Sequence, residues 1–208
     1  NELKIKINKL NLNNYNPNIV AVSKTFSMQD IDPLINHGHI HFGENKVQEA
    51  VEKWSNVKND IKSIKLHMVG KLQTNKVKYV IPLFDYVHSL DNLKLAEKIS
   101  KEQIKKNKII NLFIQINIGN EKQKNGILIE ELDSFYKTCT QDLGLKIIGL
   151  MCLPPNEKKS SIFFHKMQQL TEKLHLKEIS MGMSSDYLDA INFKATYLRI
   201  GTKIFGEG

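Results

Sequence analysis

Residues 19–28 read IVAVSKTFSM, and they distinguish between the two folds that a chain of alternating strands and helices can form. An apolar run, 19–22, leads into a polar turn at Ser23-Lys24 that continues through Thr25 to Met28. The first turn of a doubly wound open sheet usually carries a G-x-G-x-x-G phosphate loop, and no glycine stands in this turn. The stretch therefore favours the first strand of a closed barrel over that of an open sheet.

The rest of the chain repeats the alternation of strand and helix. Apolar runs of strand length recur at intervals of roughly 20 to 35 residues, and a segment with helical periodicity follows each. They predict eight strands, at residues 19–24, 39–44, 65–69, 86–90, 111–118, 146–152, 178–183 and 197–200. Helices are predicted between them, among them 46–54, 92–106, 129–140 and 160–174, with Asn45, Asp91, Asn92 or Ser160 as caps. Eight such units predict an α/β fold, a single (β/α)₈ TIM barrel.

Length and composition predict one soluble domain over residues 1–208. A chain of 208 residues with 41% hydrophobic content supports one sizeable core and is short for two. No apolar run approaches the roughly 20 residues of a membrane span, and residues 1–16 are polar and rich in Asn, unlike a signal peptide. Cys139 and Cys152 lack CxxC spacing, so we expect a reducing, cytoplasmic location and assign neither cysteine a role.

The net charge of +8 comes from 29 lysines and one arginine, Arg199. The lysines are scattered and often adjoin an acidic residue, as in Glu52-Lys53, which is typical of a solvated surface. Arginine supplies the planar fork that reads guanine and clamps phosphate, so this composition disfavours a nucleic-acid binder. Because lysine could serve where only charge is needed, the one arginine is a candidate functional residue.

Two loops have the composition of a phosphate site. TIM barrels commonly bind phosphate in the loops after strands 7 and 8, with backbone N–H groups and small residues. Gly182-Met183-Ser184 and Gly201-Thr202 occupy those loops. Each loop alone is more readily explained as an ordinary turn, since Gly and Ser favour turns, but the pair at these two strands favours phosphate.

Lys24 is the candidate nucleophile. It follows an apolar run at the predicted carboxyl end of the first strand, the face on which barrels place their chemistry. A lysine held there is expected to be partly desolvated, which frees its amine to attack a carbonyl and form an imine. A surface charge is the alternative for any one of 29 lysines. A strand-end lysine, a phosphate site and a lone arginine together suit a phosphorylated aldehyde cofactor.

The sequence resembles the pyridoxal phosphate homeostasis proteins, which are similar to the N-terminal barrel of alanine racemase. The resemblance runs from about residue 19 to residue 206 and rests on nine motifs in order. They are AVSKT at 21–25, FGEN at 42–45, HMVGKLQTNK at 67–76, SLD at 89–91, QIN at 115–117, KNG at 124–126, GLM at 149–151, SMGMS at 180–184 and RIGTKIFG at 199–206.

This resemblance implies a fold-type III barrel that binds pyridoxal 5′-phosphate as a Schiff base on Lys24. It also implies roles for five further residues: Asn45 lines the ring, Arg199 faces the pyridine nitrogen, and Ser184, Gly201 and Thr202 hold the phosphate. The expected function is vitamin B6 homeostasis in the cytoplasm, by buffering the cofactor or supplying it to apo forms of pyridoxal-phosphate enzymes. We expect a monomer without strong catalytic activity and without nucleic-acid or membrane partners.

Two other functions compete with this expectation. An amino-acid racemase needs two acid/base groups on opposite faces of the substrate carbon, and Lys24 supplies one. In the racemases that this barrel resembles, a partner subunit places a tyrosine as the other, and a second, all-β domain completes the site. Gly208 ends the sequence soon after the last predicted strand, and an always-protonated Arg199 beside the pyridine nitrogen would weaken the ring as an electron sink. Racemisation is therefore the less favoured function.

The other competing function is metal-dependent hydrolysis. His37, His39 and His41 have the i, i+2, i+4 spacing that would place them on one face of a strand. His37 and His39 fall at the amino end of the predicted second strand, away from the catalytic face, so we expect structural or surface histidines. We likewise expect His67 to be a core or ring-supporting residue.

Overall fold

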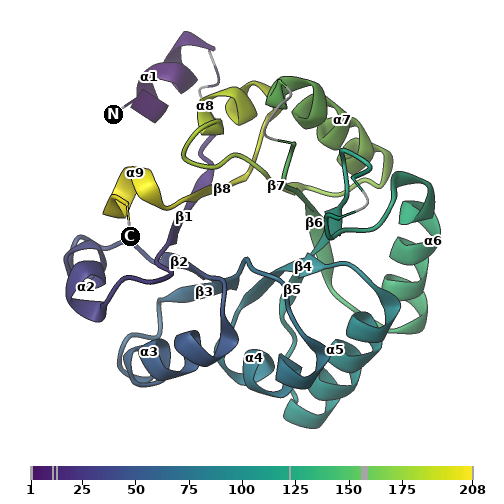
Figure 1. Ribbon diagram of the computed structural model, residues 1–208, viewed down its shortest axis with the longest axis horizontal. Coiled ribbons are helices and arrows are strands. Elements are labelled where there is room, and N and C mark those ends of the chain that lie inside the picture. The colour runs from purple at the N-terminus through teal and green to yellow at the C-terminus, as the bar shows by residue number, and fades with distance from the viewer. Residues whose placement is uncertain (1, 11, 13, 122, 156–158, 208) are drawn as a thin grey trace.

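The eight predicted strands close into one parallel barrel in chain order (Figure 1). The computed structural model describes residues 2–10, 12, 14–121, 123–155 and 159–207. The strands are β1 (Asn18–Val22), β2 (His41–Glu44), β3 (Lys65–Met68), β4 (Tyr86–Leu90), β5 (Asn111–Ile116), β6 (Ile147–Cys152), β7 (Glu178–Ser180) and β8 (Tyr197–Ile200). β8 pairs with β1, with Val20 opposite Arg199, and this pairing completes the TIM barrel.

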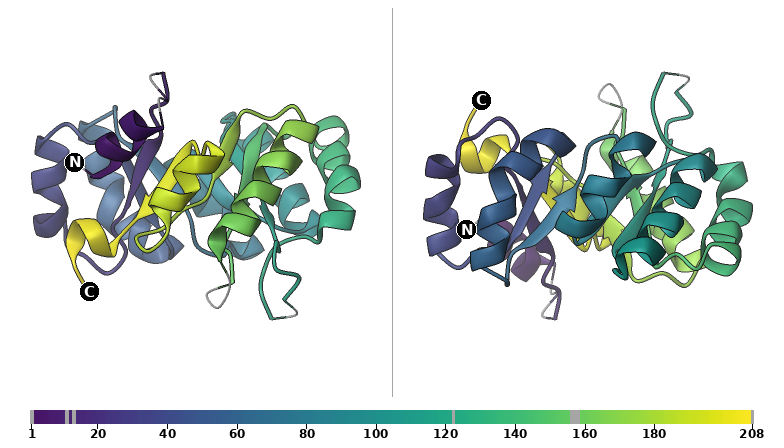
Figure 2. Two further views of the ribbon diagram at one scale, coloured as in Figure 1. Left: turned by 90° about the horizontal axis from the view of Figure 1, so that it is seen from above. Right: turned by 90° about the horizontal axis from the view of Figure 1, so that it is seen from below.

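Helices follow the strands and surround the barrel, as Figure 1 shows. They are α1 (Glu2–Lys9), α2 (Met28–Asn36), α3 (Val47–Asp60), α4 (Val77–Leu83), α5 (Leu93–Lys106), α6 (Leu132–Lys137), α7 (Ser160–Lys173), α8 (Tyr187–Ala190) and α9 (Thr202–Phe205). Among the described residues, no helix combines the length and apolar character needed to cross a bilayer. Figure 2 shows the barrel from two sides, with helices lying outside the strands.

Several strands are shorter than predicted. β1 ends at Val22, β5 at Ile116 and β7 at Ser180, although the apolar pattern extended each by two or three residues. The extra residues belong to loops at the carboxyl end of the barrel. There Ser23 and Asn117 are buried by side-chain contacts, so burial continues after strand pairing has stopped.

The structure confirms Asn92 as a helix cap and contradicts Asn45 and Ser160. Asn92 caps α5, because its side chain accepts a 2.9 Å hydrogen bond from the Leu95 N–H. Lys46 and Lys159, not Asn45 and Ser160, occupy the cap positions of α3 and α7. The Ser160 hydroxyl instead donates to Asp186 Oδ2, at 3.1 Å.

Alternation along the strands divides the core into two layers. Val20, Phe113, Met151 and Tyr197 pack together inside the barrel, whereas neighbours such as Ala21 and Leu198 pack between the strands and the helices. The inner layer is small because polar side chains share the interior. Arg199 is two residues from Tyr197 on β8 and therefore also points inward.

Three histidines occupy that interior. His41 Nδ1 lies 2.9 Å from His67 Nε2, and His67 Nδ1 lies 2.9 Å from His88 Nε2. His88 Nδ1 lies 2.8 Å from the Ser180 hydroxyl, which accepts a 2.5 Å hydrogen bond from Arg199 Nη1. This imidazole chain, defined as His41, His67, His88 and Ser180, crosses the barrel from the amino end of β2 to Arg199.

Candidate functional site

A cavity of about 560 Å³ opens at the carboxyl end of the barrel. Its lining comes from the ends of β1, β2 and β3 and from the loops after β6, β7 and β8. Twelve of the described residues line it: Val22, Lys24, Asn45, Val69, Leu153, Met183, Ser184, Ser185, Arg199, Gly201, Thr202 and Lys203. All six residues singled out from the sequence are among them, so the fold brings together segments as distant as Lys24 and Thr202.

Lys24 lies two residues beyond the end of β1 and is exposed. The expectation that its amine is partly desolvated is therefore wrong. The apolar run that suggested burial ends before the lysine, and Ser23 is the residue that the barrel buries. An exposed amine at the mouth of a cavity remains accessible to a carbonyl compound from solvent.

The turn that carries Lys24 is held on both sides. The Ser23 hydroxyl donates to Glu44 Oε1 at 2.8 Å, and the Thr25 N–H donates to Glu49 Oε1 at 2.9 Å. Thr25 has a φ of 68°, a left-handed conformation that a β-branched residue rarely adopts. Strain of this kind persists only where surrounding contacts over-determine the backbone, and it is frequent at binding sites.

Glu44 anchors this turn to the barrel wall. Its buried carboxylate accepts hydrogen bonds from Ser23, from Lys53 Nζ at 3.0 Å and from Trp54 Nε1 at 2.9 Å. Lys53 also donates to the Ser23 carbonyl, at 2.9 Å. Lys53 and Trp54 were not identified from the sequence, because their role depends on α3 lying against the ends of β1 and β2.

Arg199 is a buried cation at the floor of the cavity, with 5% of the residue exposed. Its Nη1 donates to Ser180 Oγ and its Nη2 donates to the Cys152 carbonyl, at 2.8 Å. Both acceptors are neutral. Burial lowers the pKa of Arg199 from its ordinary value, but a guanidinium remains protonated in proteins. A positive charge is thus fixed beneath the cavity.

Ser180 and His88 support Arg199 from inside the barrel, a role that the sequence did not indicate. Burial is the main cause that lowers the pKa of His67 and His88 well below the ordinary value, and it lowers that of His41 to about 4. The three imidazoles are therefore neutral near pH 7. Each can accept at one ring nitrogen and donate at the other, as a continuous chain to Ser180 requires.

The loops after β7 and β8 meet at Ser184. Its Oγ accepts from the N–H groups of Gly201, at 3.3 Å, and Lys203, at 3.4 Å. These bonds are long, so the two N–H groups can readily turn to a stronger, anionic acceptor. Gly182 has a φ of +90°, and a Cβ there would lie 2.8 Å from Ala190 Cβ, so the β7 loop requires glycine.

Asn45 lies at the cavity wall with an unpartnered polar atom. Among the described residues, Asn45 Oδ1 is buried without a hydrogen-bond partner. A Cβ at Gly70 would lie 2.3 Å from the Asn45 carbonyl oxygen, so the loop after β3 holds the Asn45 backbone in place. A buried amide oxygen of this kind is costly unless a ligand or water satisfies it.

The histidines suggested as metal ligands do not converge. His37 follows α2, His39 lies in the loop before β2, and only His41 belongs to a strand. Its neighbour in the barrel is His67, from β3. Within the part of the chain that the structure describes, no group of three His, Cys, Asp or Glu side chains could hold a metal ion.

Comparison with known proteins identifies relatives of the whole barrel. Residues 4–208 match the family model described as "Alanine racemase, N-terminal domain". The pyridoxal phosphate homeostasis protein of Aquifex aeolicus is 36% identical over 198 residues, which cover 91% of this chain and 86% of that protein. The protein of the same name from Escherichia coli (strain K12) is 34% identical, covering 90% of this chain and 84% of its own.

Solved structures agree with this assignment. PipY of Synechococcus elongatus PCC7942, solved without PLP, superposes with a TM-score of 0.87 at 30% identity, covering 97% of this chain and 98% of PipY. PipY with PLP bound gives a TM-score of 0.84 at the same identity. Alanine racemase of Clostridium difficile 630 shares the fold alone, with a TM-score of 0.73 at 11% identity over 52% of its chain.

The match to the family model, the identity to curated relatives and the shared barrel all lead to one assignment. The chain belongs to the pyridoxal phosphate homeostasis protein family, built on the alanine racemase N-terminal domain.

Proposed function

We propose that this protein binds pyridoxal 5′-phosphate through Lys24 and serves as a carrier of vitamin B6 in the cytoplasm. One observation carries the proposal: an exposed lysine amine, a buried guanidinium and a loop of hydroxyl and N–H donors line the same cavity. PipY, a relative of known structure, has been solved with PLP bound.

The residues of this cavity fit the three ends of the cofactor. A phosphate monoester carries a charge of about −1.5 to −2 at neutral pH and accepts strong hydrogen bonds. Ser184, Thr202 and the N–H groups of Gly201 and Lys203 would hold it. Arg199 would donate to the pyridine nitrogen, and Asn45 would use its unpartnered Oδ1 at the ring.

When bound, the cofactor would supply an electrophilic aldehyde, and Lys24 would provide the amine that holds it. The strained turn at Thr25 and the Glu44 contacts of Ser23 fix the backbone that carries this amine. The exposure of Lys24 leaves the link open to water and to other amines. Such a link reverses readily, as a carrier requires.

Two features of the lining disfavour strong catalysis. Arg199 keeps a positive charge where the pyridine nitrogen would lie, which disfavours protonation of that nitrogen. Within the described lining, Lys203 is the one amine besides Lys24, and its hydrogen bond to Glu2 holds its pKa above the ordinary value. Racemisation needs a second base on the opposite face of the substrate carbon, and a lysine kept protonated is a poor one.

The partners follow from the carrier role. Apo forms of pyridoxal-phosphate enzymes would receive the cofactor, and residues 1–208 would act as one domain and as a monomer, without nucleic-acid or membrane partners. Among the described residues, the lysines that line the cofactor cavity are Lys24 and Lys203.

A transfer experiment tests this function. The protein is loaded with one equivalent of pyridoxal phosphate, separated from free cofactor and mixed with an apo-transaminase. We expect the transaminase to regain activity, and we expect Lys24→Ala protein, treated in the same way, to deliver much less. Failure of the loaded protein to restore activity would contradict the carrier role.

A second assay distinguishes the carrier from a racemase. In deuterated water with L-alanine and the cofactor, the protein should exchange the α-hydrogen no faster than free cofactor does. Exchange well above that background, abolished by Lys24→Ala, would establish a proton-abstracting site and displace the carrier proposal.

A further inference from the structure

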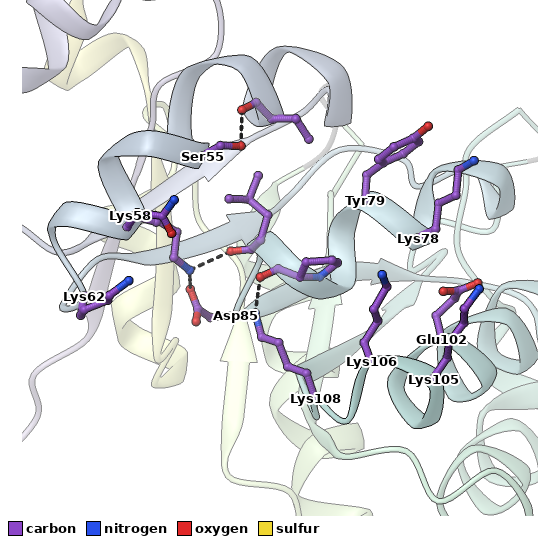
Figure 3. Close-up of a pocket in the computed structure, with 14 residues that line it drawn as sticks. Ser55, Lys58, Lys62, Lys78, Tyr79, Asp85, Glu102, Lys105, Lys106 and Lys108 are labelled. Carbon is purple, nitrogen blue, oxygen red and sulfur yellow. Dashed lines mark hydrogen bonds and ion pairs between the residues drawn. The ribbon is translucent and has the colours of Figure 1, made fainter.

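A second, larger cavity lies at the opposite end of the barrel (Figure 3). It measures about 770 Å³ and is bounded by the carboxyl-terminal halves of α3 and α5 and by α4. Asp85, which directly precedes β4, and Lys108, which precedes β5, line it. Since strands begin at this end, the cavity is separated from the cofactor site by the length of the barrel.

This cavity gathers much of the positive charge of the chain. Its fourteen lining residues include six lysines and two acidic residues, a net charge of +4, half of the chain's +8. The lysines are Lys58, Lys62, Lys78, Lys105, Lys106 and Lys108. Lysines that are scattered in sequence are thus clustered in space, because three helices end here.

Two of the six lysines have a structural role. Lys58 donates to the Leu83 carbonyl at 2.7 Å and pairs with Asp85, and Lys108 donates to the carbonyls of Pro82 and Phe84 at 2.9 and 3.0 Å. They satisfy the free carbonyls at the end of α4. The acidic residues are also engaged, since Asp85 binds Lys58 and Glu102 pairs with Lys98.

The side chains of the other four lysines form no ion pair or hydrogen bond with any residue that the structure describes. These lysines are Lys62, Lys78, Lys105 and Lys106. Lys105 and Lys106 lie in the last turn of α5, where cations offset the helix dipole. That explanation fails for Lys78, which lies in the first turn of α4, where the dipole disfavours a cation. Figure 3 shows Lys62 on one side of the cavity and Lys78, Lys105 and Lys106 on the other.

The lining also offers an apolar surface and a hydrogen-bond acceptor. Tyr79 is 42% exposed, with Lys78 Nζ 4.9 Å from its ring centre, and Pro82 lies beside it in the lining. Glu102 Oε2 is buried and, in the described part of the chain, has no hydrogen-bond partner. A purely anionic ligand would leave that oxygen unsatisfied, whereas a ligand with a hydroxyl or amino group would satisfy it.

We propose that this cavity binds a phosphorylated organic molecule with a planar ring and a hydrogen-bond donor, the chemistry of a nucleotide. The four lysines whose side chains form no ion pair or hydrogen bond among the described residues bind its phosphate groups as point charges. Its ring packs on Tyr79 and Pro82, and its donor bonds to Glu102 Oε2. A groove of about 770 Å³ has room for a small organic ligand.

Calorimetric titration of the protein with ADP at low ionic strength tests the proposal, with and without one equivalent of pyridoxal phosphate. We expect one ADP per chain in both cases, because the two sites are separate. Adenosine and inorganic phosphate, which each supply half of the contacts, should bind more weakly than ADP. The result is independent of the proposed function, since ADP binding requires no cofactor.

Matched variants locate the site. Lys62→Gln/Lys106→Gln should weaken ADP binding by at least about tenfold, because each change removes a charged hydrogen-bond donor. Lys137→Gln/Lys166→Gln removes the same charge from exposed positions on α6 and α7 and should leave the affinity unchanged. Equal loss in both variants, no ADP binding, or binding of a polyglutamate peptide in place of ADP would each overturn the proposal.

Discussion

At the scale of single residues, one buried hydroxyl connects the cofactor site to the barrel interior. Ser180 Oγ accepts from Arg199 and contacts His88 Nδ1. The motif SMGMS contains this serine, but the sequence pointed only to the loop that follows it, Gly182-Met183-Ser184. His41, His67 and His88 lie on three different strands, so their alignment arises from the barrel's register and leaves no pattern in the sequence.

Ser180→Ala should lower the free energy of unfolding by about 1–3 kcal/mol, because Arg199 and His88 would each lose a buried partner. It should also weaken cofactor binding, since Arg199 would no longer be fixed. Urea denaturation and titration measure the two effects. Ser134→Ala, which removes an exposed hydroxyl on α6, is the control and should change neither. Unchanged stability in Ser180→Ala would contradict the proposed role of this serine.

The backbone of Thr25 offers a second test at this scale. Thr25→Gly removes a β-branched side chain from a left-handed conformation and should stabilise the fold by up to about 1 kcal/mol. Asn107→Gly is the matched control, because asparagine tolerates its φ of 47° and the gain should be smaller. Thermal denaturation of both variants decides the point; a destabilised Thr25→Gly protein would show that no strain is stored there.

Among the secondary-structure elements, all eight strands were predictable from the sequence, because apolar runs of four to eight residues differ from the periodicity of a helix. The ends of the strands were not predictable in the same way. Residues such as Ser23 and Asn117 are buried by loop contacts, so the burial pattern continues past the last ladder hydrogen bond. Lys24 is exposed for the same reason, because β1 ends at Val22, two residues earlier than the apolar pattern predicts.

The loops after β7 and β8 are expected to bind the phosphate group of the cofactor together. Pyridoxal should bind at least about tenfold more weakly than its phosphate, because hydrogen bonds to a charged group are about twice as strong as neutral ones. Ser184→Ala should reduce the difference in affinity between pyridoxal and pyridoxal phosphate. Ser185→Ala, in the same loop and cavity lining, is the control. Equal affinities for pyridoxal and its phosphate, measured by titration, would exclude a phosphate site in these loops.

At the scale of the whole molecule, the barrel encloses three histidines whose burial keeps them neutral. Their pKa values are lowered in the folded state, so the unfolded chain binds more protons than the folded chain below the unfolded pKa of about 6.5. Their contribution to stability is complete above pH 6.5 and is lost as the pH falls toward the folded values. The sequence contains seven histidines, and composition alone does not show which of them the barrel buries.

We therefore expect the free energy of unfolding to fall below pH 6.5 by about 1.4 kcal/mol per pH unit for each buried histidine. Urea denaturation between pH 7.5 and pH 5 measures the slope. His88→Gln should reduce the slope by about 1.4 kcal/mol per pH unit, the contribution of one proton. His37→Gln, at an exposed position, should leave the slope unchanged. A stability that does not change over this range would mean that the imidazole chain already carries protons in the folded state.

We propose that the barrel holds its cofactor through one of the 29 lysines of the chain, Lys24. The most direct measurement is borohydride reduction of the protein with one equivalent of pyridoxal phosphate, followed by peptide mapping with mass spectrometry. We expect a visible absorption band that reduction removes, with the label on Lys24 and no band in Lys24→Ala protein. A label on another lysine, with Lys24 unmodified, would contradict it.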